Sequence, residues 1–321
     1  MIIMGKNLLK VLGVIALLLI VYAAFQGIFS GLLIGVAVGY SIATGKVTAD
    51  QFKDIPNIEK LSDIPGIEGC AIDIMAAALF LAALSMLLFI HFTKLFRLRM
   101  SLFSSIAFKP LLVSTLLVFF SMFALNILVQ FFPLEDNLSN EFQGLSHNLL
   151  GALTISVLGP VLEEVMFRGA MQGYMMRRLH TPWAAIVTAS VVFGVFHMNP
   201  VQVVYATMLG IVFGWIYYRT GSLMSVIVGH VLNNSIATLT MLCFGESTET
   251  EIIEELSPFA ENVMSGILFA VCAAIAILLA VKLNRMLPAP PAPWHDSDEK
   301  PQPSFESSEA SAAMQEISSE Q

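Results

Sequence analysis

The sequence predicts an all-α membrane protein that crosses the bilayer about eight times. Of its 321 residues, 56% are hydrophobic and only 12% are charged, whereas a soluble domain carries roughly 25% charged residues. The apolar residues also fall into runs of about 20, the length of a helix that spans the hydrocarbon core of a bilayer. Lipid must therefore solvate much of this chain.

Eight apolar segments are interpreted as membrane helices. They are residues 8–35, 71–93, 110–132, 148–167, 183–198, 201–217, 223–244 and 263–284. The first apolar run continues to Ala43, which is too long for the hydrophobic region of a secretory signal, about 7 to 15 residues. We expect a retained anchor helix here, followed by either a second span or a segment on the membrane surface.

Basic residues near the ends of the segments support eight spans, because Lys and Arg in short loops stay cytoplasmic. With eight spans, one side of the membrane receives Lys6, Lys10, Lys94, Arg97, Arg99, Arg177, Arg178, Arg219, Lys282 and Arg285. The loops that follow residues 132 and 244 fall on the other side and are acidic, and only the 44–70 loop, with three lysines, blurs the pattern. We expect a multi-pass protein of the cell (inner) membrane with both termini cytoplasmic.

Four parts are expected along the chain. Residues 1–144 hold the first helices and outer loops, residues 145–245 a core rich in ionisable residues, residues 246–287 an acidic outer loop and the last helix, and residues 288–321 a tail. The tail is rich in Pro, Ser and Glu and carries seven acidic residues and one lysine, so we expect it to be disordered.

Charge and cysteine content exclude several classes of partner. The tail supplies most of the net charge of −8, the membrane body is nearly neutral, and no basic stripe suited to nucleic acid is present. Cys70, Cys243 and Cys272 lack the spacing of a zinc site or a disulfide framework, so we expect them to be unpaired.

Ionisable residues inside the spans are concentrated in the core. A charge at the bilayer centre costs about 2.5 to 3.5 kcal/mol, so such a residue needs a partner or a function. In GPVLEEVMFRG, Glu164 and Arg168 lie four residues apart, the spacing of an ion pair on one helical face. Glu163 points about 100° away, so its carboxylate should bind a proton, a water or a histidine from another helix.

Pro160 removes a backbone donor, which can kink the helix and admit water.

Two further segments carry imidazoles. In VVFGVFHMNP, Phe193 and His197 share a face, and Gly194 permits close approach of another helix. In VIVGHVLNN, His230 and Asn234 share a face, whereas Asn233 points elsewhere.

Each segment also has a plain structural interpretation: a charge cluster at a helix end, a packing histidine, and hydrogen bonds between helices. Together, one carboxylate, two imidazoles and one amide at similar depths indicate a common site.

Such a site is suited to hydrolysis. A carboxylate and an imidazole can remove a proton from water, while a second imidazole and an amide donate to the oxyanion that forms when water attacks a peptide carbonyl. Alternatively, Glu163, His197 and His230 can ligate Zn²⁺, which would activate the water. The residue types alone do not choose between these schemes. The sequence has no H-E-x-x-H motif, no pair of aspartates in the spans, and no serine in a Gly-x-Ser-Gly context.

At these residues the sequence resembles the CAAX-protease and bacteriocin-processing family (CPBP, also called Abi) of intramembrane proteases. The family pattern E-E-x-x-x-R, F-x-x-x-H and H-x-x-x-N is matched by Glu163-Glu164 with Arg168, Phe193 with His197, and His230 with Asn234. The resemblance covers roughly residues 145–245 and would make them the catalytic core. The family has been described both as metal-dependent and as glutamate-dependent, so a zinc cofactor stays open.

The resemblance also implies roles. Glu163 would be the general base and His197 its partner on the water, His230 and Asn234 would stabilise the oxyanion, and Glu164, Arg168 and Phe193 would support them. Eukaryotic members cleave prenylated C-terminal peptides, and bacterial relatives are linked to bacteriocin maturation or self-immunity. We therefore expect a peptide or membrane-protein substrate.

Two other functions would use the same residues. A non-catalytic membrane scaffold or bacteriocin-immunity protein would bind a partner through the polar cluster or the tail. A proton-coupled transporter would use Glu163 and the histidines as a relay, although eight spans without visible repeats argue against it.

Overall fold

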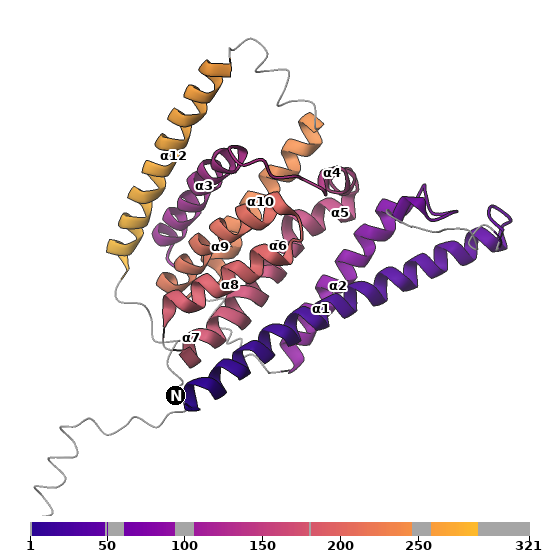
Figure 1. Cartoon of the computed structure of the whole chain (residues 1–321), viewed down its shortest axis with the longest axis horizontal. Coiled ribbons are helices and arrows are strands. Elements are labelled where there is room, and N and C mark those ends of the chain that lie inside the picture. Colours follow the sequence, from indigo (N-terminus) through magenta and orange to yellow (C-terminus); the bar gives the residue numbers. More distant parts are fainter. Residues whose placement is uncertain are drawn as a thin grey trace, which may run out of the picture. The chain divides into compact units, whose positions relative to one another are not determined.

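The computed structural model describes residues 2–48, 50, 61–93, 106–179, 181–245 and 258–287. Within these residues all regular structure is helical (Figure 1), which confirms the predicted all-α class. The longer helices are α1 (Ile2–Ala43), α2 (Ala71–Thr93), α3 (Phe108–Gln130), α4 (Ser139–His147), α8 (Pro182–Phe196), α9 (Pro200–Thr220), α10 (Met224–Phe244) and α12 (Pro258–Met286). A 3₁₀ turn, η2, covers Leu61–Asp63.

Seven helices of the described residues are long and apolar enough to cross a membrane. They are Leu9–Ala43, Ala71–Thr93, Phe108–Gln130, Leu149–Arg178, Pro200–Thr220, Met224–Phe244 and Asn262–Met286. The remaining predicted segment forms α8, whose 15 residues extend only about 22 Å, less than the roughly 30 Å of the hydrocarbon core. The chain is thus a polytopic membrane protein with seven candidate spans and one shorter apolar helix.

Helix α1 corrects one expectation. Its 42 residues form one continuous helix, about 63 Å long, with no break into a second span or a separate surface segment. No proline interrupts residues 2–43. The helix ends where Gly45 adopts a left-handed φ of 72°, a conformation that glycine adopts without steric penalty.

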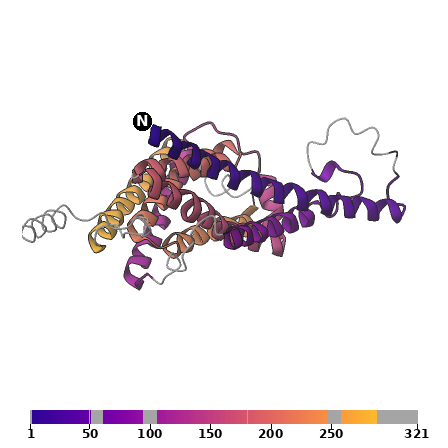
Figure 2. The same cartoon turned by 90° about the horizontal axis from the view of Figure 1, so that it is seen from below.

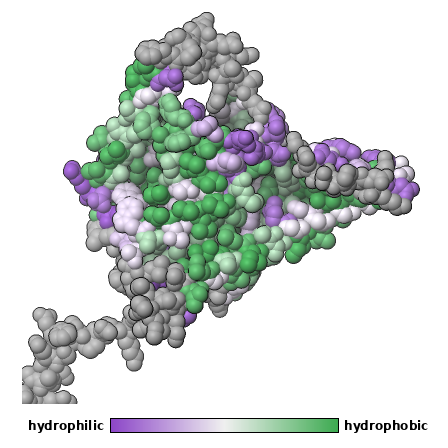
Figure 3. Space-filling view, in the orientation of Figure 1, coloured by the Kyte–Doolittle hydropathy of each residue, from purple (hydrophilic) through white to green (hydrophobic). Residues whose placement is uncertain are grey.

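Lipid-facing surface covers much of the helical body. Helices α1 and α2 lie side by side, as do α12 and α3 (Figures 1 and 2). Hydrophobic residues dominate the face drawn in Figure 3. Large exposed apolar side chains occur along α1, α2, α3, α8 and α12, as expected of a surface that lipid solvates.

The helix that carries Glu163 alternates between α and π geometry. It consists of α5 (Leu149–Leu153), the π-helical η4 (Thr154–Leu158), α6 (Gly159–Glu163), the π-helical η5 (Glu164–Gln172) and α7 (Gly173–Leu179). In π-helical stretches each N–H bonds to the carbonyl five residues earlier, and such stretches are frequent at functional sites. All nine residues of η5 are buried.

Two smaller expectations can be compared with the structure, and a third falls on residues that it does not describe. The cysteines are free, as predicted. A Cβ on Gly194 would overlap with Thr207 Oγ1 of α9, so the predicted close helix approach is confirmed. The acidic loop at residues 246–257 and the tail at 288–321 lie outside the described residues.

Candidate active site

The predicted ion pair on the Glu163 helix is present. Arg168 Nη1 lies 2.8 Å from Glu164 Oε1, and neither side chain is exposed. The guanidinium also lies 4.4 Å from the centroid of the Phe193 ring and 5.2 Å from that of Phe213. A buried charge needs a partner and further hydrogen bonds, and this arginine has a carboxylate and two aromatic faces.

Two glycines on α9 allow this helix to approach. Arg168 Nη2 donates to the Gly210 carbonyl at 3.2 Å, and Gln172 Nε2 donates to the Gly214 carbonyl at 2.8 Å. A Cβ would lie 3.1 Å from Arg168 Nη2 if added to Gly210, and 2.8 Å from Gln172 Oε1 if added to Gly214. Small residues spaced by four are a known signal for close packing of membrane helices. The spacing of Gly210 and Gly214 is thus a signal in the sequence that was not used to predict the site.

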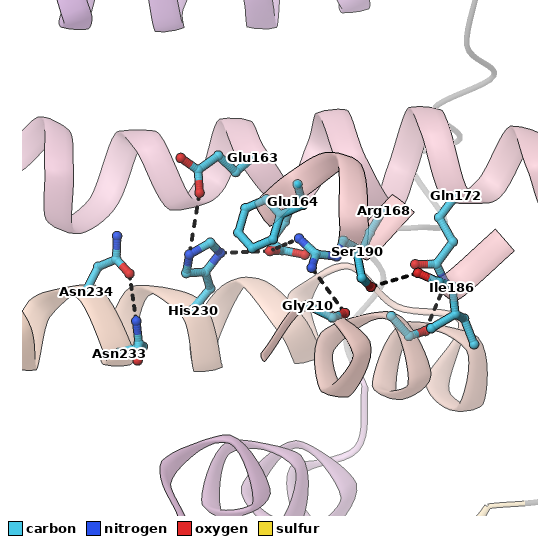
Figure 4. A network of polar contacts seen from close by, with 12 residues as sticks. Glu163, Glu164, Arg168, Gln172, Ile186, Ser190, Gly210, His230, Asn233 and Asn234 are labelled. Carbon is cyan, nitrogen blue, oxygen red and sulfur yellow. Dashed lines mark hydrogen bonds and ion pairs between the residues drawn. The ribbon is translucent and has the colours of Figure 1, made fainter. Parts of the chain in front are cut away.

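His230 of α10 sits between the two adjacent glutamates (Figure 4). Its Nδ1 lies 2.7 Å from Glu164 Oε1, and its Nε2 lies 3.5 Å from Glu163 Oε2. A neutral imidazole has one donor and one acceptor nitrogen, and an ionised carboxylate only accepts. With Glu164 ionised, Nδ1 therefore donates to Glu164, and Nε2 is the nitrogen that faces Glu163.

Among the described residues, Glu163 and Glu164 each carry one buried carboxylate oxygen, Oε2, without a hydrogen-bond partner. The 3.5 Å separation of Glu163 Oε2 from His230 Nε2 is longer than a good N–H···O bond. The Glu163 side chain is 19% exposed, against none for Glu164. Of the three partners expected for Glu163, a proton, a water or a histidine, the structure shows a histidine from another helix at 3.5 Å, and the same oxygen can still accept a hydrogen bond from a water or a substrate atom.

His197 follows the last residue of α8. Its Nδ1 lies 2.8 Å from the Phe193 carbonyl oxygen, which can only accept, so Nδ1 carries hydrogen and Nε2 of the neutral ring is an acceptor. The Phe193 ring lies 4.9 Å from the His197 ring and 5.8 Å from the His230 ring, between centroids. Phe193 thus brings both imidazoles to one aromatic ring, whereas the direct ionic contact of Glu163 is with His230.

The Asn234 carboxamide belongs to a short chain of hydrogen bonds. Its Nδ2 donates to the Ile155 carbonyl at 2.9 Å, and its Oδ1 accepts from Asn233 Nδ2 at 2.9 Å. Tyr205 donates its hydroxyl to Asn233 Oδ1 at 2.7 Å. Asn233 was expected to point elsewhere, which is wrong for its polar end: although neighbouring residues start about 100° apart on a helix, the two side chains reach each other.

The side chains named as possible zinc ligands do not form a metal site here. Among the described residues, no group of three or more His, Cys, Asp or Glu side chains is arranged to hold a metal ion. Both nitrogens of His230 face glutamates, and Nδ1 of His197 faces a carbonyl. The donor set Glu163, His197 and His230 therefore does not fit a zinc ion in this geometry.

An outer polar contact braces the turn after His197. Asn199, which is fully buried, donates Nδ2 to Asp136 Oδ1 at 2.8 Å and accepts from the Asn137 N–H at 3.3 Å. Between His197 and Asn199, Met198 adopts a left-handed φ of 51°, uncommon for a residue with a side chain. The α8–α9 turn is therefore held by the loop that follows α3.

Comparisons with known proteins match the segment of the chain that contains Glu163, His197 and His230. Residues 145–236 match the family model described as "Type II CAAX prenyl endopeptidase Rce1-like". The Bacillus subtilis (strain 168) protein named "Putative membrane peptidase YdiL" is 29% identical over 87 residues, which are 27% of this chain and 35% of that protein. The chain thus spans about a third of the length of this curated relative, and no solved structure matches the chain. Residues 145–236 are thus similar to the Rce1-like CAAX prenyl endopeptidases and to a putative membrane peptidase.

Proposed function

We propose that this protein is an intramembrane endopeptidase of the CAAX type that hydrolyses a peptide bond with a water bound at Glu163. The observation that carries the proposal is the buried Oε2 of Glu163, which has no hydrogen-bond partner among the described residues and lies 3.5 Å from His230, whose other ring nitrogen contacts Glu164. An unpaired carboxylate oxygen in an apolar site is a strong acceptor for a water proton.

Glu163 acts as the general base, with His197 as its partner on the same water. The hydrogen bond from His197 Nδ1 to the Phe193 carbonyl leaves Nε2 as the accepting nitrogen. The water oxygen attacks the carbonyl carbon and its proton passes to Glu163. As the C–N bond then breaks, this proton goes to the amine that leaves, so the enzyme ends in the protonation state in which it began.

His230 and Asn234 stabilise the negative oxygen of the tetrahedral intermediate. They lie four residues apart on α10, so both project from one face of this helix. With Nδ1–H donating to Glu164, His230 offers Nε2–H in its doubly protonated form, and Asn234 offers the N–H that Ile155 does not use. Donors placed in advance where charge develops are worth about 10² to 10³ in rate each.

Glu164 and Arg168 are positioning residues in this scheme. The carboxylate of Glu164 contacts both His230 and Arg168, so it orients the imidazole as a carboxylate orients histidine in hydrolase triads. Phe193 contacts Arg168, His197 and His230 and thereby spaces the charged and imidazole groups.

For the substrate, we propose a membrane-associated peptide or protein, with a prenylated C-terminal peptide as the first candidate because the matching family model names that activity. We further propose that the protein resides in the cell membrane with both termini cytoplasmic, which counts the short helix α8 as an eighth crossing, and that the site opens toward the cytoplasmic half. The pattern of basic residues near the helix ends supports this orientation.

The deciding experiment compares membrane peptidomes from cells that produce the wild type, Glu163→Gln, His197→Ala or Glu141→Gln at equal levels. Glutamine keeps the shape of Glu163 but cannot take a proton, so product peptides should fall at least about 100-fold, and His197→Ala should remove the same peptides. Glu141, in the first turn of α4, is the matched control and should leave them unchanged.

A scaffold or immunity protein would give another result. The peptidome of Glu163→Gln would then equal that of the wild type, and the proposal would be rejected. An internally quenched peptide with a farnesylated CAAX end, added to purified protein in proteoliposomes, tests the first substrate candidate separately.

A further inference from the structure

One backbone carbonyl beside the site lacks its helical donor. In the π-helical stretch η4, the Gly159 N–H donates to the Thr154 carbonyl five residues earlier. The same pattern would give the Ile155 carbonyl the N–H of residue 160, but residue 160 is proline and has none. Ile155 therefore presents a carbonyl that the helix itself does not satisfy.

Asn234 of α10 supplies the missing donor. Its side-chain nitrogen Nδ2 lies 2.9 Å from the Ile155 oxygen. Because a carbonyl oxygen only accepts, the atom of the carboxamide that faces it must be nitrogen. Pro160, by leaving the Ile155 carbonyl without a helical donor, thus fixes the orientation of the Asn234 carboxamide on the neighbouring helix.

The same reasoning extends along the chain of hydrogen bonds. With Nδ2 of Asn234 on Ile155, its Oδ1 faces Asn233, which must present Nδ2, and this bond is 2.9 Å. Asn233 then turns its Oδ1 toward Tyr205, which can donate its hydroxyl, at 2.7 Å. Every orientation is consistent from the Ile155 carbonyl to the Tyr205 hydroxyl.

We infer that Pro160, Asn233 and Tyr205 are positioning residues that hold the Asn234 carboxamide with its second N–H free to donate to the oxyanion. This inference rests on the proposed function. An asparagine without such partners has no preferred orientation, because its oxygen and nitrogen are nearly the same size. A reversed Asn234 would turn its oxygen toward the oxyanion and repel it.

Tyr205→Phe removes the hydroxyl that ends the chain. Product peptides whose formation depends on Glu163 are measured over time in membranes that hold equal amounts of each variant. We expect their initial rate to fall about fivefold to tenfold, the effect of losing one hydrogen bond that biases the amide. Tyr218→Phe, the same change on α9 at another half-buried tyrosine, is the matched control and should keep the wild-type rate.

A double variant separates positioning from general support. Asn234→Ala should lower the rate about 100-fold. If Tyr205 acts through Asn234, then Tyr205→Phe has no further effect in the Asn234→Ala background. A further drop of fivefold or more in the double variant would mean that Tyr205 serves the structure in another way, and would overturn the inference.

Pro160→Ala gives the sharpest contrast between stability and rate. Alanine restores an N–H that can bond to the Ile155 carbonyl and suits a helix better than proline, so Asn234 loses its fixed partner. We expect an unchanged or higher midpoint of thermal unfolding together with a fivefold to tenfold lower rate. Pro182→Ala, at the first turn of α8 where proline replaces no bonded N–H, should change neither.

The outcomes distinguish this inference from the proposed function. If Glu163→Gln abolishes the products while Tyr205→Phe or Pro160→Ala cleaves at the wild-type rate, the inference is wrong and the protease assignment stands. If Glu163→Gln removes no peptide, both are wrong. Loss of rate in Pro160→Ala without loss of thermal stability, together with a silent Tyr205→Phe in the Asn234→Ala background, supports it.

Discussion

Replacing Arg168 by methionine should be among the most damaging single changes in the membrane body. The side chain is fully buried, 2.8 Å from the carboxylate of Glu164, and donates to the Gly210 carbonyl at 3.2 Å. Removing one partner of a buried ion pair leaves the other charge uncompensated, which costs about 3 to 5 kcal/mol. This substitution also removes the contact between the guanidinium and the Phe193 ring, so part of the lost free energy comes from that cation–π contact.

The double variant Glu164→Gln with Arg168→Met measures how much of the loss comes from the stranded carboxylate. Glutamine can still accept from His230 Nδ1 through its carbonyl oxygen, and no buried charge is left. We expect the double variant to lie within about 2 kcal/mol of the wild type, because neutral replacement of a buried pair is often tolerated.

The measurement is the free energy of unfolding in mixed micelles, titrated with sodium dodecyl sulfate and followed by far-UV circular dichroism. Arg178→Met is the control: Arg178 lies at the end of α7, 5.3 Å from the Tyr174 ring centroid and partly exposed, so its removal should cost less than about 1 kcal/mol. A single Arg168→Met variant within about 1 kcal/mol of the wild type, or a double variant as unstable as the single one, would refute the reasoning.

Two further predictions follow from close contacts. Gly214→Val places a Cβ 2.8 Å from Gln172 Oε1 and 3.0 Å from Ile186 Cγ2, so the free energy of unfolding in the same titration should fall by about 1 to 3 kcal/mol, whereas Gly266→Val, with open space around it, should show no such overpacking loss. Asn199→Asp turns a buried donor on Asp136 into a second carboxylate. Since protonation at lower pH restores the hydrogen bond, thermal unfolding should show a larger loss at pH 8 than at pH 5, and equal losses would contradict this.

Features that depend on one helix were accessible from the sequence. The Glu164–Arg168 pair follows from the period of the helix, and the candidate spans follow from the length of the apolar runs. The closeness of α8 and α9 was anticipated at Gly194 because a residue without a side chain permits contact. Whether residues 8–43 hold one span, two spans or a span and a surface segment stayed open, because apolar length alone does not show where a helix ends.

Contacts between helices were not accessible in the same way. A histidine was expected opposite Glu163, but the sequence did not choose between His197 and His230. The structure has the ionic contact with His230, while His197 bonds to a carbonyl of its own helix. Tyr205 and Gln172 escaped notice, because neither residue stands out in an apolar helix until its partner on another helix is known.

The sequence by itself determined that the chain is a helical membrane protein and which segment gathers its intramembrane acids, imidazoles and amides, because bilayer thickness and helical period act on neighbouring residues. Only the tertiary structure decided that one imidazole lies between two glutamates and that a proline in one helix orients an amide in another. The Glu164–His230 contact joins residues that are 66 positions apart in the sequence, and the Ile155–Asn234 contact joins residues that are 79 positions apart. They depend on how far each helix is rotated and how closely it approaches its neighbour, which local sequence does not specify.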